Sequence, residues 1–316
     1  MALRNVVNRD DVLWFASNVT ERAPKLLRKL TSSDRQRTID DFSTVSTYPQ
    51  WWDVPAVQRR WNTLVTGSAD TDIHSWLADR FLSDGGHVGV SVGCGSGQRE
   101  LSWARTGAFE TLIGVDLTPP LVENAREAAS SAGLADVLRF EVADVTTGPP
   151  GGARPDVLIG EHSIHHFAPL PEMLRGFRDM LAPGGLLLID EFVGPNRFQW
   201  TDDQLECTNA LLHLLPERLR MQPDGRIKKR IPRPSLLYMR LKDPSEAIQS
   251  ELILPLLDEL FECRLMRPYG GTVLHILLAG IAHNFADEDD AEAQEWLGVL
   301  MDTEDRLLEE GRIDSD

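Results

Sequence analysis

Cysteine is rare in this sequence, and no apolar stretch is long. The three cysteines, Cys94, Cys207 and Cys263, are widely separated, which matches neither a zinc site nor a disulfide-stabilised secreted domain. The longest apolar stretches, near 186–189 and 273–282, fall far short of the roughly 20 residues that cross a bilayer. The N-terminus shows no signal-peptide pattern. We therefore predict a cytoplasmic protein that makes no use of a membrane.

Basic residues are also in the minority. The chain has 32 Lys and Arg against 49 Asp and Glu, a net charge of −17 at pH 7. Such a charge disfavours nucleic acids and anionic membranes as partners. The basic run 226–233 is typical of a solvated loop, although it could instead contact an anionic substrate. We expect a small-molecule partner and a chain that acts as a monomer or homodimer.

The stretch around which the chain is organised is 88–97, VGVSVGCGSG. β-Branched residues followed by Gly93, Gly95 and Gly97 indicate a buried parallel strand that ends in a tight turn. Glycine allows the backbone of such a turn to approach a ligand closely. The following residues, 98–104, are predicted to form a helix whose free N–H groups face that ligand. This pattern indicates a nucleotide site at the carboxyl end of the first strand.

Strands and helices alternate over the middle of the chain, and this alternation is typical of a doubly wound α/β sheet. The pattern predicts strands at 88–92, 111–115, 137–142, 156–159 and 186–192 and helices at 72–82, 98–104, 118–132 and 171–181. Later in the chain, 261–267 and 272–281 are predicted to be two further strands joined by the turn at 269–271.

The spacing of the glycines is G-x-G-x-G, because Gln98 stands where a dinucleotide fingerprint has its third glycine. This form resembles motif I of the class I S-adenosylmethionine (SAM) methyltransferases. The resemblance implies a Rossmann-like sheet with a final antiparallel hairpin. The expected divisions are an N-terminal helical lid at 1–71, a SAM-binding core at 72–195, a helical cap at 196–258, the hairpin at 259–285 and an acidic C-terminal helix at 286–316.

Acidic residues at strand ends supply the expected cofactor contacts. Asp116, which ends the second strand, can accept both ribose hydroxyl protons, although it could also be a helix cap. The resemblance implies that Asp144 and the Val145 backbone N–H receive the adenine, unless Asp144 is an ordinary turn residue. The expected cofactor-binding residues are Gly93, Cys94, Gly95, Gly97, Asp116, Leu117, Asp144, Val145 and Glu161.

One position departs from the resemblance. Many family members carry an acidic residue two positions before the first motif glycine, where it helps to orient the methionine part of SAM, and here that residue is Ser91. Glu100, Glu161 or the N-terminal lid could take over this role.

The loop after the fourth strand, GEHSIHHF at 160–167, contains two adjacent histidines. One of them, His165 or His166, is the expected catalytic base, because histidine removes a hydroxyl proton near neutral pH. The alternative is that the pair only shapes the loop through hydrogen bonds. The loop lacks the D/N-P-P-Y/F signature of DNA and glutamine amino-methyltransferases, which again argues against nucleic acid.

A metal site at the same strand ends is a further possibility, because several potential ligands follow the fourth and fifth strands. Their spacing matches no defined metal motif, so we predict no metal. The potential ligands are His162, His165, His166, Asp190 and Glu191.

Substrate contacts are assigned to Trp52, Arg197 and Trp200, each of which could equally be a packing residue. The pieces WWDVPAVQRRWN and VSVGCGSG resemble bacterial methyltransferases of glycan and natural-product pathways. We therefore predict a SAM-dependent methyltransferase that acts on a hydroxyl of a sugar, glycolipid or secondary metabolite. The alternatives are N- or C-methylation of a small molecule and a non-catalytic binding module; an NAD(P)-dependent oxidoreductase is disfavoured by Gln98.

Overall fold

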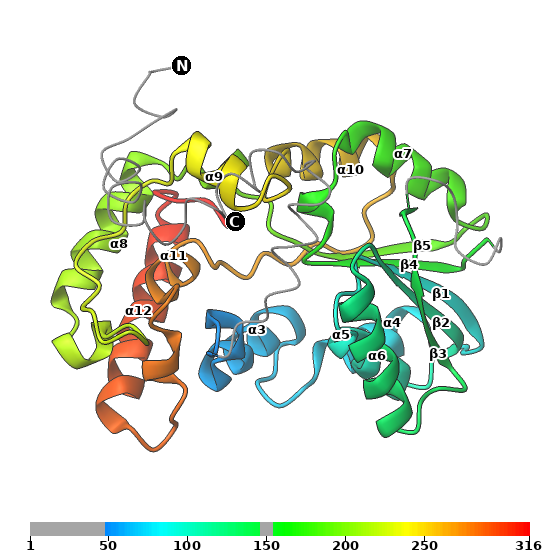
Figure 1. The fold of residues 1–316 in the computed structure, drawn as a ribbon, viewed down its shortest axis with the longest axis horizontal. Coiled ribbons are helices and arrows are strands. Elements are labelled where there is room, and N and C mark those ends of the chain that lie inside the picture. Colours follow the sequence, from blue (N-terminus) through cyan, green and yellow to red (C-terminus); the bar gives the residue numbers. More distant parts are fainter. Residues whose placement is uncertain (1–47, 146–153) are drawn as a thin grey trace. The chain divides into compact units, whose positions relative to one another are not determined.

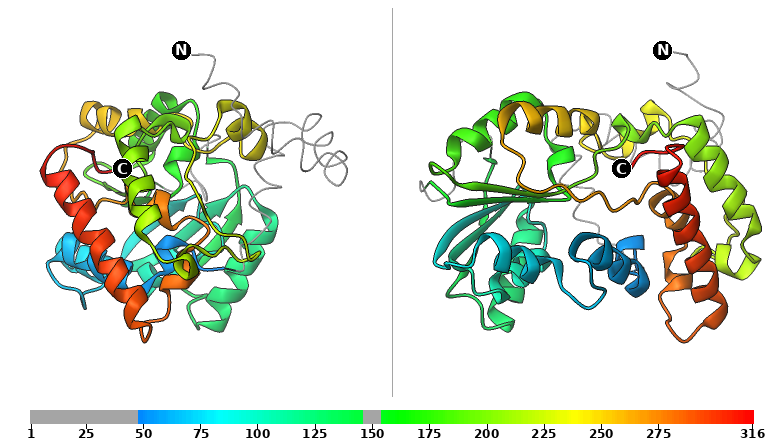
Figure 2. Two further views of the ribbon diagram at one scale, coloured as in Figure 1. Left: turned by 90° about the vertical axis from the view of Figure 1, so that its left-hand side faces the viewer. Right: turned by 180° about the vertical axis from the view of Figure 1, so that it is seen from behind.

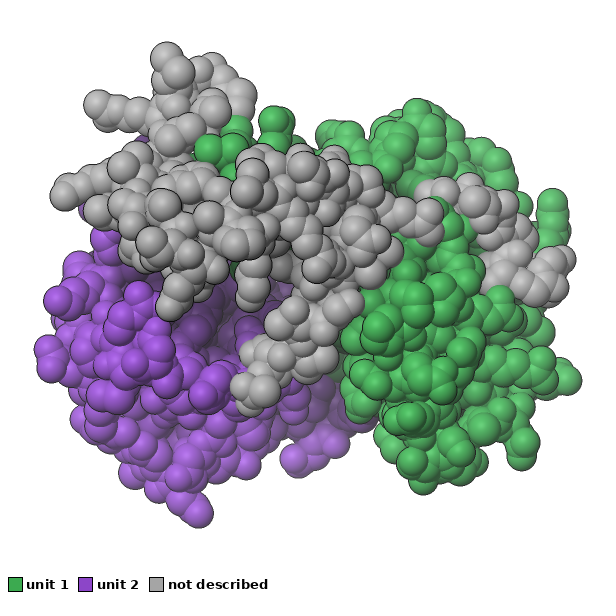
Figure 3. Space-filling model, viewed as in Figure 1, with its two compact units in different colours: residues 1–44, 73–197, 235–264 green, residues 45–72, 198–234, 265–316 purple. Residues whose placement is uncertain are grey.

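The computed structural model describes residues 48–145 and 154–316, which form two compact units (Figure 3). Within the described residues, the first unit comprises 73–145, 154–197 and 235–264, and the second comprises 48–72, 198–234 and 265–316. Most of the predicted lid and the start of the loop before the fourth strand lie outside the described residues. The predicted division into lid, core and cap stays a prediction, and each unit is described here by itself.

The first unit is built on a five-stranded sheet in the order β3-β2-β1-β4-β5 (Figure 1). Every pair of neighbouring strands is parallel. The strands are β1 His87–Val92, β2 Phe109–Asp116, β3 Leu138–Val142, β4 Val157–Glu161 and β5 Leu186–Asp190. The predicted mixed α/β, Rossmann-like sheet is therefore confirmed.

Helices cover both faces of this sheet, which explains why β1, β2 and β4 are buried apolar runs without strict alternation (Figure 1). One apolar cluster joins α4, α5 and α6 to one face, and a second joins α7 and α10 to the other. Figure 2 shows the same three layers of this unit from behind. The helices are α4 Ile73–Phe81, α5 Gln98–Arg105, α6 Pro119–Ser131, α7 Leu170–Met180, α9 Leu236–Lys242 and α10 Ile253–Leu260.

The second unit is helical. Its helices are α3 Pro55–Thr66, α8 Asp202–Leu214, α11 Leu274–Leu278 and α12 Ala291–Glu309. α11 packs against α8 and α12. The buried indole rings of Trp51 and Trp61 meet edge to face, with 4.9 Å between their centroids, so this aromatic contact belongs to the core of the unit.

The predicted antiparallel hairpin at 259–285 is wrong. The expected first strand, 261–267, contains no strand, and residues of the expected second strand form the buried helix α11. The run VLHILL is too short for its periodicity to distinguish a strand from a buried helix. The Glu304 carboxylate accepts the backbone N–H groups of Val273 at 2.7 Å and Leu274 at 3.0 Å. This distant acceptor caps the first turn and stabilises the helix.

Among the helices at 48–145 and 154–316, none combines the length and the apolar character that crossing a membrane requires.

Candidate active site

The glycine turn follows β1 directly and is held to β2. The N–H groups of Gly93 and Cys94 donate to the Val115 carbonyl at 2.8 and 3.0 Å. Gly93, Gly95 and Gly97 all have a positive φ, +70°, +53° and +77°, a conformation that favours glycine. The Cys94 thiol between them is protonated, because burial raises its pKa, assisted by the negative charges of Glu100 and Asp116.

Close packing explains why Gly93 and Gly97 carry no side chain, whereas Gly95 is surrounded by open space. A Cβ atom on Gly93 would lie 2.5 Å from the Cβ of Ser163, and one on Gly97 would lie 2.6 Å from the Phe140 ring. A Cβ atom on Gly95 would meet no other atom within 4 Å. The turn is therefore packed against the loop after β4 on one side and leaves space beside Gly95.

Asp116 lies at the end of β2, where it fixes the turn. Its Oδ2 accepts the N–H of Gly95 at 3.0 Å, and its Oδ1 accepts the N–H of Thr118 at 2.8 Å. Leu117, the next residue, is half-buried. A carboxylate has about four lone-pair positions, so Asp116 can accept further hydrogen bonds while it holds Gly95.

The end of β3 lies beside the end of β2, because the Ala143 N–H donates to the Asp116 carbonyl at 3.1 Å. This contact brings the half-buried Asp144 and Val145 to the same edge of the sheet as Asp116. The structure therefore brings together the strand ends to which the ribose and adenine contacts were assigned.

Charged side chains gather where β1 and β4 end. Ser91 Oγ donates to Glu100 Oε1 at 2.6 Å. Glu161, the last residue of β4, has its Oε1 3.2 Å from His74 Nε2 and its Oε2 4.0 Å from Arg99 Nε. The predicted cofactor residue Glu161 thus lies close to the side-chain nitrogens of His74 and Arg99.

The histidine loop is held by Glu191, which follows β5. Glu191 Oε1 accepts the N–H groups of Ser163 and Ile164, both at 2.5 Å. Its Oε2 lies 2.5 Å from His165 Nδ1. Since the two histidines follow β4 and Glu191 follows β5, the parallel pairing of these strands positions the whole group.

Electrostatics set the two histidines apart. Burial by itself lowers the pKa of His165, but the charge and hydrogen bond of Glu191 outweigh burial and raise this pKa. Burial, assisted by the charge of His165, lowers the pKa of His166. Burial opposes the ionisation of Glu191, yet the charge and hydrogen bond of His165 bring its pKa below the ordinary value. The arrangement favours a His165–Glu191 ion pair beside a neutral His166.

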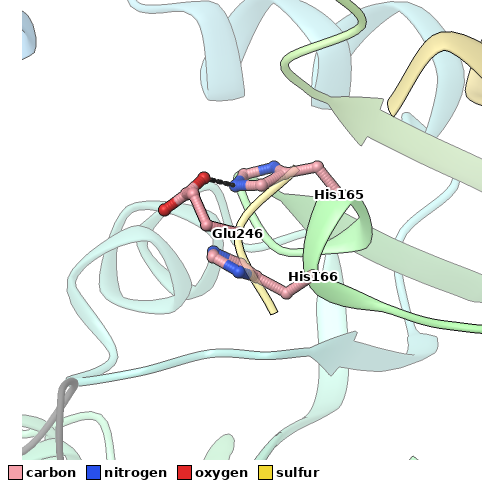
Figure 4. Close-up of side chains that lie close together, drawn as sticks. All are labelled: His165, His166 and Glu246. Carbon is pink, nitrogen blue, oxygen red and sulfur yellow. Dashed lines mark ion pairs between the residues drawn. The ribbon is translucent and has the colours of Figure 1, made fainter. Parts of the chain in front are cut away.

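The segment after α9 completes the group. Ser245 Oγ donates to Asp243 Oδ1 at 2.6 Å, and His166 Nδ1 lies 3.2 Å from Ser245 Oγ. Because the only hydroxyl hydrogen of Ser245 is directed at Asp243, His166 Nδ1 is assigned as the donor to Ser245, and Nε2 carries the lone pair. Glu246 extends toward both imidazole rings, with its Oε1 3.5 Å from His165 Nε2 (Figure 4).

Two groupings bear on metal binding. His165, His166 and Glu246 each offer one ligand atom, and these atoms lie within 4.8 Å of one another. His162 Nε2 lies 3.4 Å from Asp190 Oδ2. Of the five ligands considered from the sequence, Glu191 instead contacts the His165 ring and two backbone N–H groups.

The predicted substrate residues fall in different units. Arg197 donates from Nη1 to the Glu246 carbonyl at 3.0 Å, so it supports the segment that carries Glu246. Trp200 is buried in the second unit, stacked on Phe198 with 4.9 Å between ring centroids. Trp52, also in the second unit, is 38% exposed. Their substrate roles stay predictions.

Sequence reasoning did not find Asp243, Ser245 and Glu246. They lie 77 to 81 positions from the histidines they approach, within a polar segment whose pattern is typical of an ordinary turn. No local signal indicates that this segment faces the histidine loop.

Comparison with known proteins finds methyltransferases that are similar to the part of the chain that contains the sheet. Residues 90–189 match a protein family described as "Methyltransferase domain". The chain is 32% identical over 126 residues to erythromycin 3''-O-methyltransferase from Saccharopolyspora erythraea, a match that covers 40% of this chain and 41% of that protein. It is 29% identical over 160 residues to the ubiquinone biosynthesis O-methyltransferase of Xanthomonas campestris, covering 50% of this chain and 62% of the relative.

A solved SAM-dependent methyltransferase from Thiobacillus denitrificans, in complex with S-adenosyl-L-homocysteine, shares 22% identity at a TM-score of 0.33 over 41% of this chain and 53% of that one. The chain thus spans between about two fifths and three fifths of the length of these curated relatives. Residues 90–189 thus match a methyltransferase domain, and the predicted resemblance of this region to the class I S-adenosylmethionine-dependent methyltransferases is confirmed.

Proposed function

We propose that the protein transfers a methyl group from SAM to a hydroxyl group of a small molecule. One observation carries the proposal: the loop with His165 and His166 is packed directly against the glycine turn, with Ser163 filling the space that a Gly93 side chain would need. The loop expected to bind the methyl donor and the loop expected to carry the base therefore contact each other at one edge of the sheet. Such positioning is the main requirement of methyl transfer.

The residues present fit a SAM molecule. The backbone beside Gly95 is open to a ligand, and Asp116 has acceptor capacity for the ribose hydroxyls. Asp144 and Val145, beside the end of β2, would receive the adenine. Glu100, a buried carboxylate, has one oxygen with no hydrogen-bond partner among the described residues, which supports a cationic group of the ligand at this end.

The chain's own residues have a limited chemical task. SAM, when bound, supplies a methyl group on a sulfonium that is already activated toward a nucleophile. His166 is favoured as the group that accepts the hydroxyl proton, because its lowered pKa keeps it neutral near pH 7. His165, paired with Glu191, and Glu246 would orient the acceptor hydroxyl.

The substrate class is proposed from the relatives. Relatives that are named for the atom they methylate include O-methyltransferases of erythromycin and of ubiquinone biosynthesis, and another relative is a 27-O-demethylrifamycin SV methyltransferase. We infer a hydroxyl of a sugar, glycolipid or secondary metabolite as the acceptor. The two competing functions are methylation of nitrogen or carbon and a binding module without catalysis.

Calorimetric titration with S-adenosylhomocysteine, SAM and NADH tests the cofactor. Micromolar binding of the two sulfur nucleotides, lost in Asp116→Ala and absent for NADH, is expected. Asp136→Ala changes an exposed aspartate of the loop before β3 and should bind normally. If neither sulfur nucleotide binds the native chain, the proposed function is wrong.

An acceptor screen with labelled SAM then separates the functions. Product masses and fragmentation show whether oxygen, nitrogen or carbon carries the methyl group. Binding without a product across hydroxyl and amine acceptors would favour the non-catalytic module.

A further inference from the structure

We propose that Glu100 binds the ammonium group of the cofactor's methionine part. This inference rests on the proposed function, because it assumes that SAM occupies the glycine turn. Many methyltransferases that this chain resembles carry an acidic residue on β1 at the position of Ser91. In this chain, we assign the role of that acidic residue to Glu100 in helix α5.

The Ser91–Glu100 contact is the first observation. Ser91 on β1 is 2% exposed and Glu100 in the first turn of α5 is 3% exposed. The serine hydroxyl donates to Glu100 Oε1 at 2.6 Å. A short side chain on the strand thus leaves room for a carboxylate that enters from the helix at the same point of the sheet edge.

The second observation is the other oxygen of this carboxyl group. Glu100 Oε2 is buried and has no hydrogen-bond partner among the described residues. Burying a carboxylate oxygen without a partner is unfavourable, so an occupant that donates hydrogen bonds would stabilise it. An alkylammonium ion has three donors and one positive charge, which matches what Glu100 lacks.

Neighbouring charges distinguish Glu100 from Glu161. Glu161 already faces His74 and Arg99, whose nitrogens lie 3.2 and 4.0 Å from its oxygens. The side chains that change the pKa of Glu100 are Ser91 from β1, Arg99 from its own helix and Glu161 from β4. The charge of Glu100 in turn raises the pKa of Cys94 in the glycine turn. Glu161 Oε2 is also buried and lacks a hydrogen-bond partner among the described residues. Glu161 nevertheless has two basic nitrogens within 4.0 Å, whereas no basic nitrogen of the described residues lies that close to the Glu100 carboxylate. Glu100 is therefore the better acceptor for an ammonium ion.

The protonation of Glu100 supports this assignment. Burial raises the pKa of Glu100 to about 7, and the hydrogen bond from Ser91 offsets part of this rise. The charge of Glu161 raises this pKa by a smaller amount, and that of Arg99 lowers it. Without a ligand, this carboxyl is then largely protonated at pH 6. An ammonium ion beside it favours the ionised form, so ligand binding at pH 6 should release a proton.

The proton release can be measured on the unmodified protein. S-adenosylhomocysteine is titrated at pH 6 in buffers of different ionisation enthalpy. The apparent binding enthalpy should change in proportion to the buffer's ionisation enthalpy, with a slope that corresponds to the release of close to one proton. The probe 5′-methylthioadenosine keeps the adenine and ribose but has no amino acid part, so its binding should release no proton.

Variants then assign the effect to one residue. In Glu100→Gln we expect about 10- to 100-fold weaker binding of S-adenosylhomocysteine, the loss of a charged hydrogen bond, with unchanged affinity for 5′-methylthioadenosine and no proton release. The double variant Ser91→Asp/Glu100→Gln returns a carboxylate to β1 and should recover most of the affinity. Circular dichroism confirms that each variant is folded.

The outcomes separate this inference from the proposed function. Unchanged S-adenosylhomocysteine affinity in Glu100→Gln together with no proton release in the native chain overturns the inference and leaves the proposed function standing. A loss of affinity in Glu161→Gln but not in Glu100→Gln assigns the ammonium to Glu161 and also overturns it. No binding of S-adenosylhomocysteine by the native chain overturns both.

Discussion

Ser163 lies against Gly93 so closely that their Cβ positions would be 2.5 Å apart if Gly93 carried a side chain. Ser163 is also one of the two residues whose backbone N–H groups bind Glu191. The glycine turn, the histidine loop and the residue that follows β5 are thus one packed assembly, and a change that disturbs the contact between Gly93 and Ser163 should affect the others.

Replacing Gly93 tests this packing. In Gly93→Ala the new methyl group overlaps Ser163, and the φ of +70° disfavours any side chain. We expect S-adenosylhomocysteine binding to weaken by at least about tenfold in calorimetry, which corresponds to a loss of about 1.4 kcal/mol. Gly176→Ala, in helix α7 with open space around the new methyl group, is the matched control and should bind normally. Normal binding in Gly93→Ala would contradict the close packing.

The two histidines should affect turnover and leave cofactor affinity intact. His166→Ala removes the proposed base, and general-base catalysis typically contributes about 10²- to 10⁴-fold. We expect kcat for a hydroxyl acceptor to fall within this range, and His165→Ala to lower kcat as well. His213→Ala, an exposed histidine of α8, should keep full activity. A His166→Ala variant with native kcat would contradict the assignment.

Glu191→Gln should shift the titration of His165. The carboxylate of Glu191 stabilises the imidazolium and so raises the pKa of His165. With the neutral amide in its place, burial dominates, and His165 should lose its proton at a lower pH than in the native chain. Histidine NMR signals followed from pH 5 to 9 measure this shift. An unchanged or higher pKa for His165 would show that Glu191 does not hold the imidazolium.

Removal of divalent metal should leave methyl transfer intact. The methyl donor is already activated, and His166 can accept the proton, so no Lewis acid is required. We expect equal kcat with and without EDTA. The side chains of His165, His166 and Glu246 are close enough together to hold a metal ion. If EDTA abolishes the activity and Mg²⁺ restores it, the prediction is wrong and a metal is assigned to these residues.

The second unit contains a buried ion pair whose loss should destabilise it. Arg60 Nη1 lies 2.9 Å from Glu304 Oε2, and Glu304 is fully buried. Arg60→Met leaves this carboxylate without its cation, and breaking a buried pair typically costs about 3–5 kcal/mol. Arg59→Met removes the exposed pair with Glu288, for which about 1 kcal/mol or less is expected. Urea unfolding compares the two variants, and equal losses would contradict the difference in burial.

Much of the first unit could be predicted from local patterns. The glycine turn, the five parallel strands and the acidic residues at their ends follow from short stretches whose composition and spacing have few structural solutions. The same reasoning predicted the wrong structure for 272–281, because a short apolar run is compatible with a strand or a buried helix. The choice depends on Glu304, a carboxylate some 30 positions away that caps the helix.

The sequence by itself therefore determined the type of sheet, its resemblance to a methyltransferase domain and the kind of cofactor that this resemblance implies, since each depends on contiguous residues. Only the tertiary structure decided which side chains face one another. It paired His165 with Glu191, brought Asp243, Ser245 and Glu246 to the histidines and placed the Glu100 carboxylate at Ser91. Such contacts join residues from different elements, and their free energy depends on burial and on distances that no local pattern specifies.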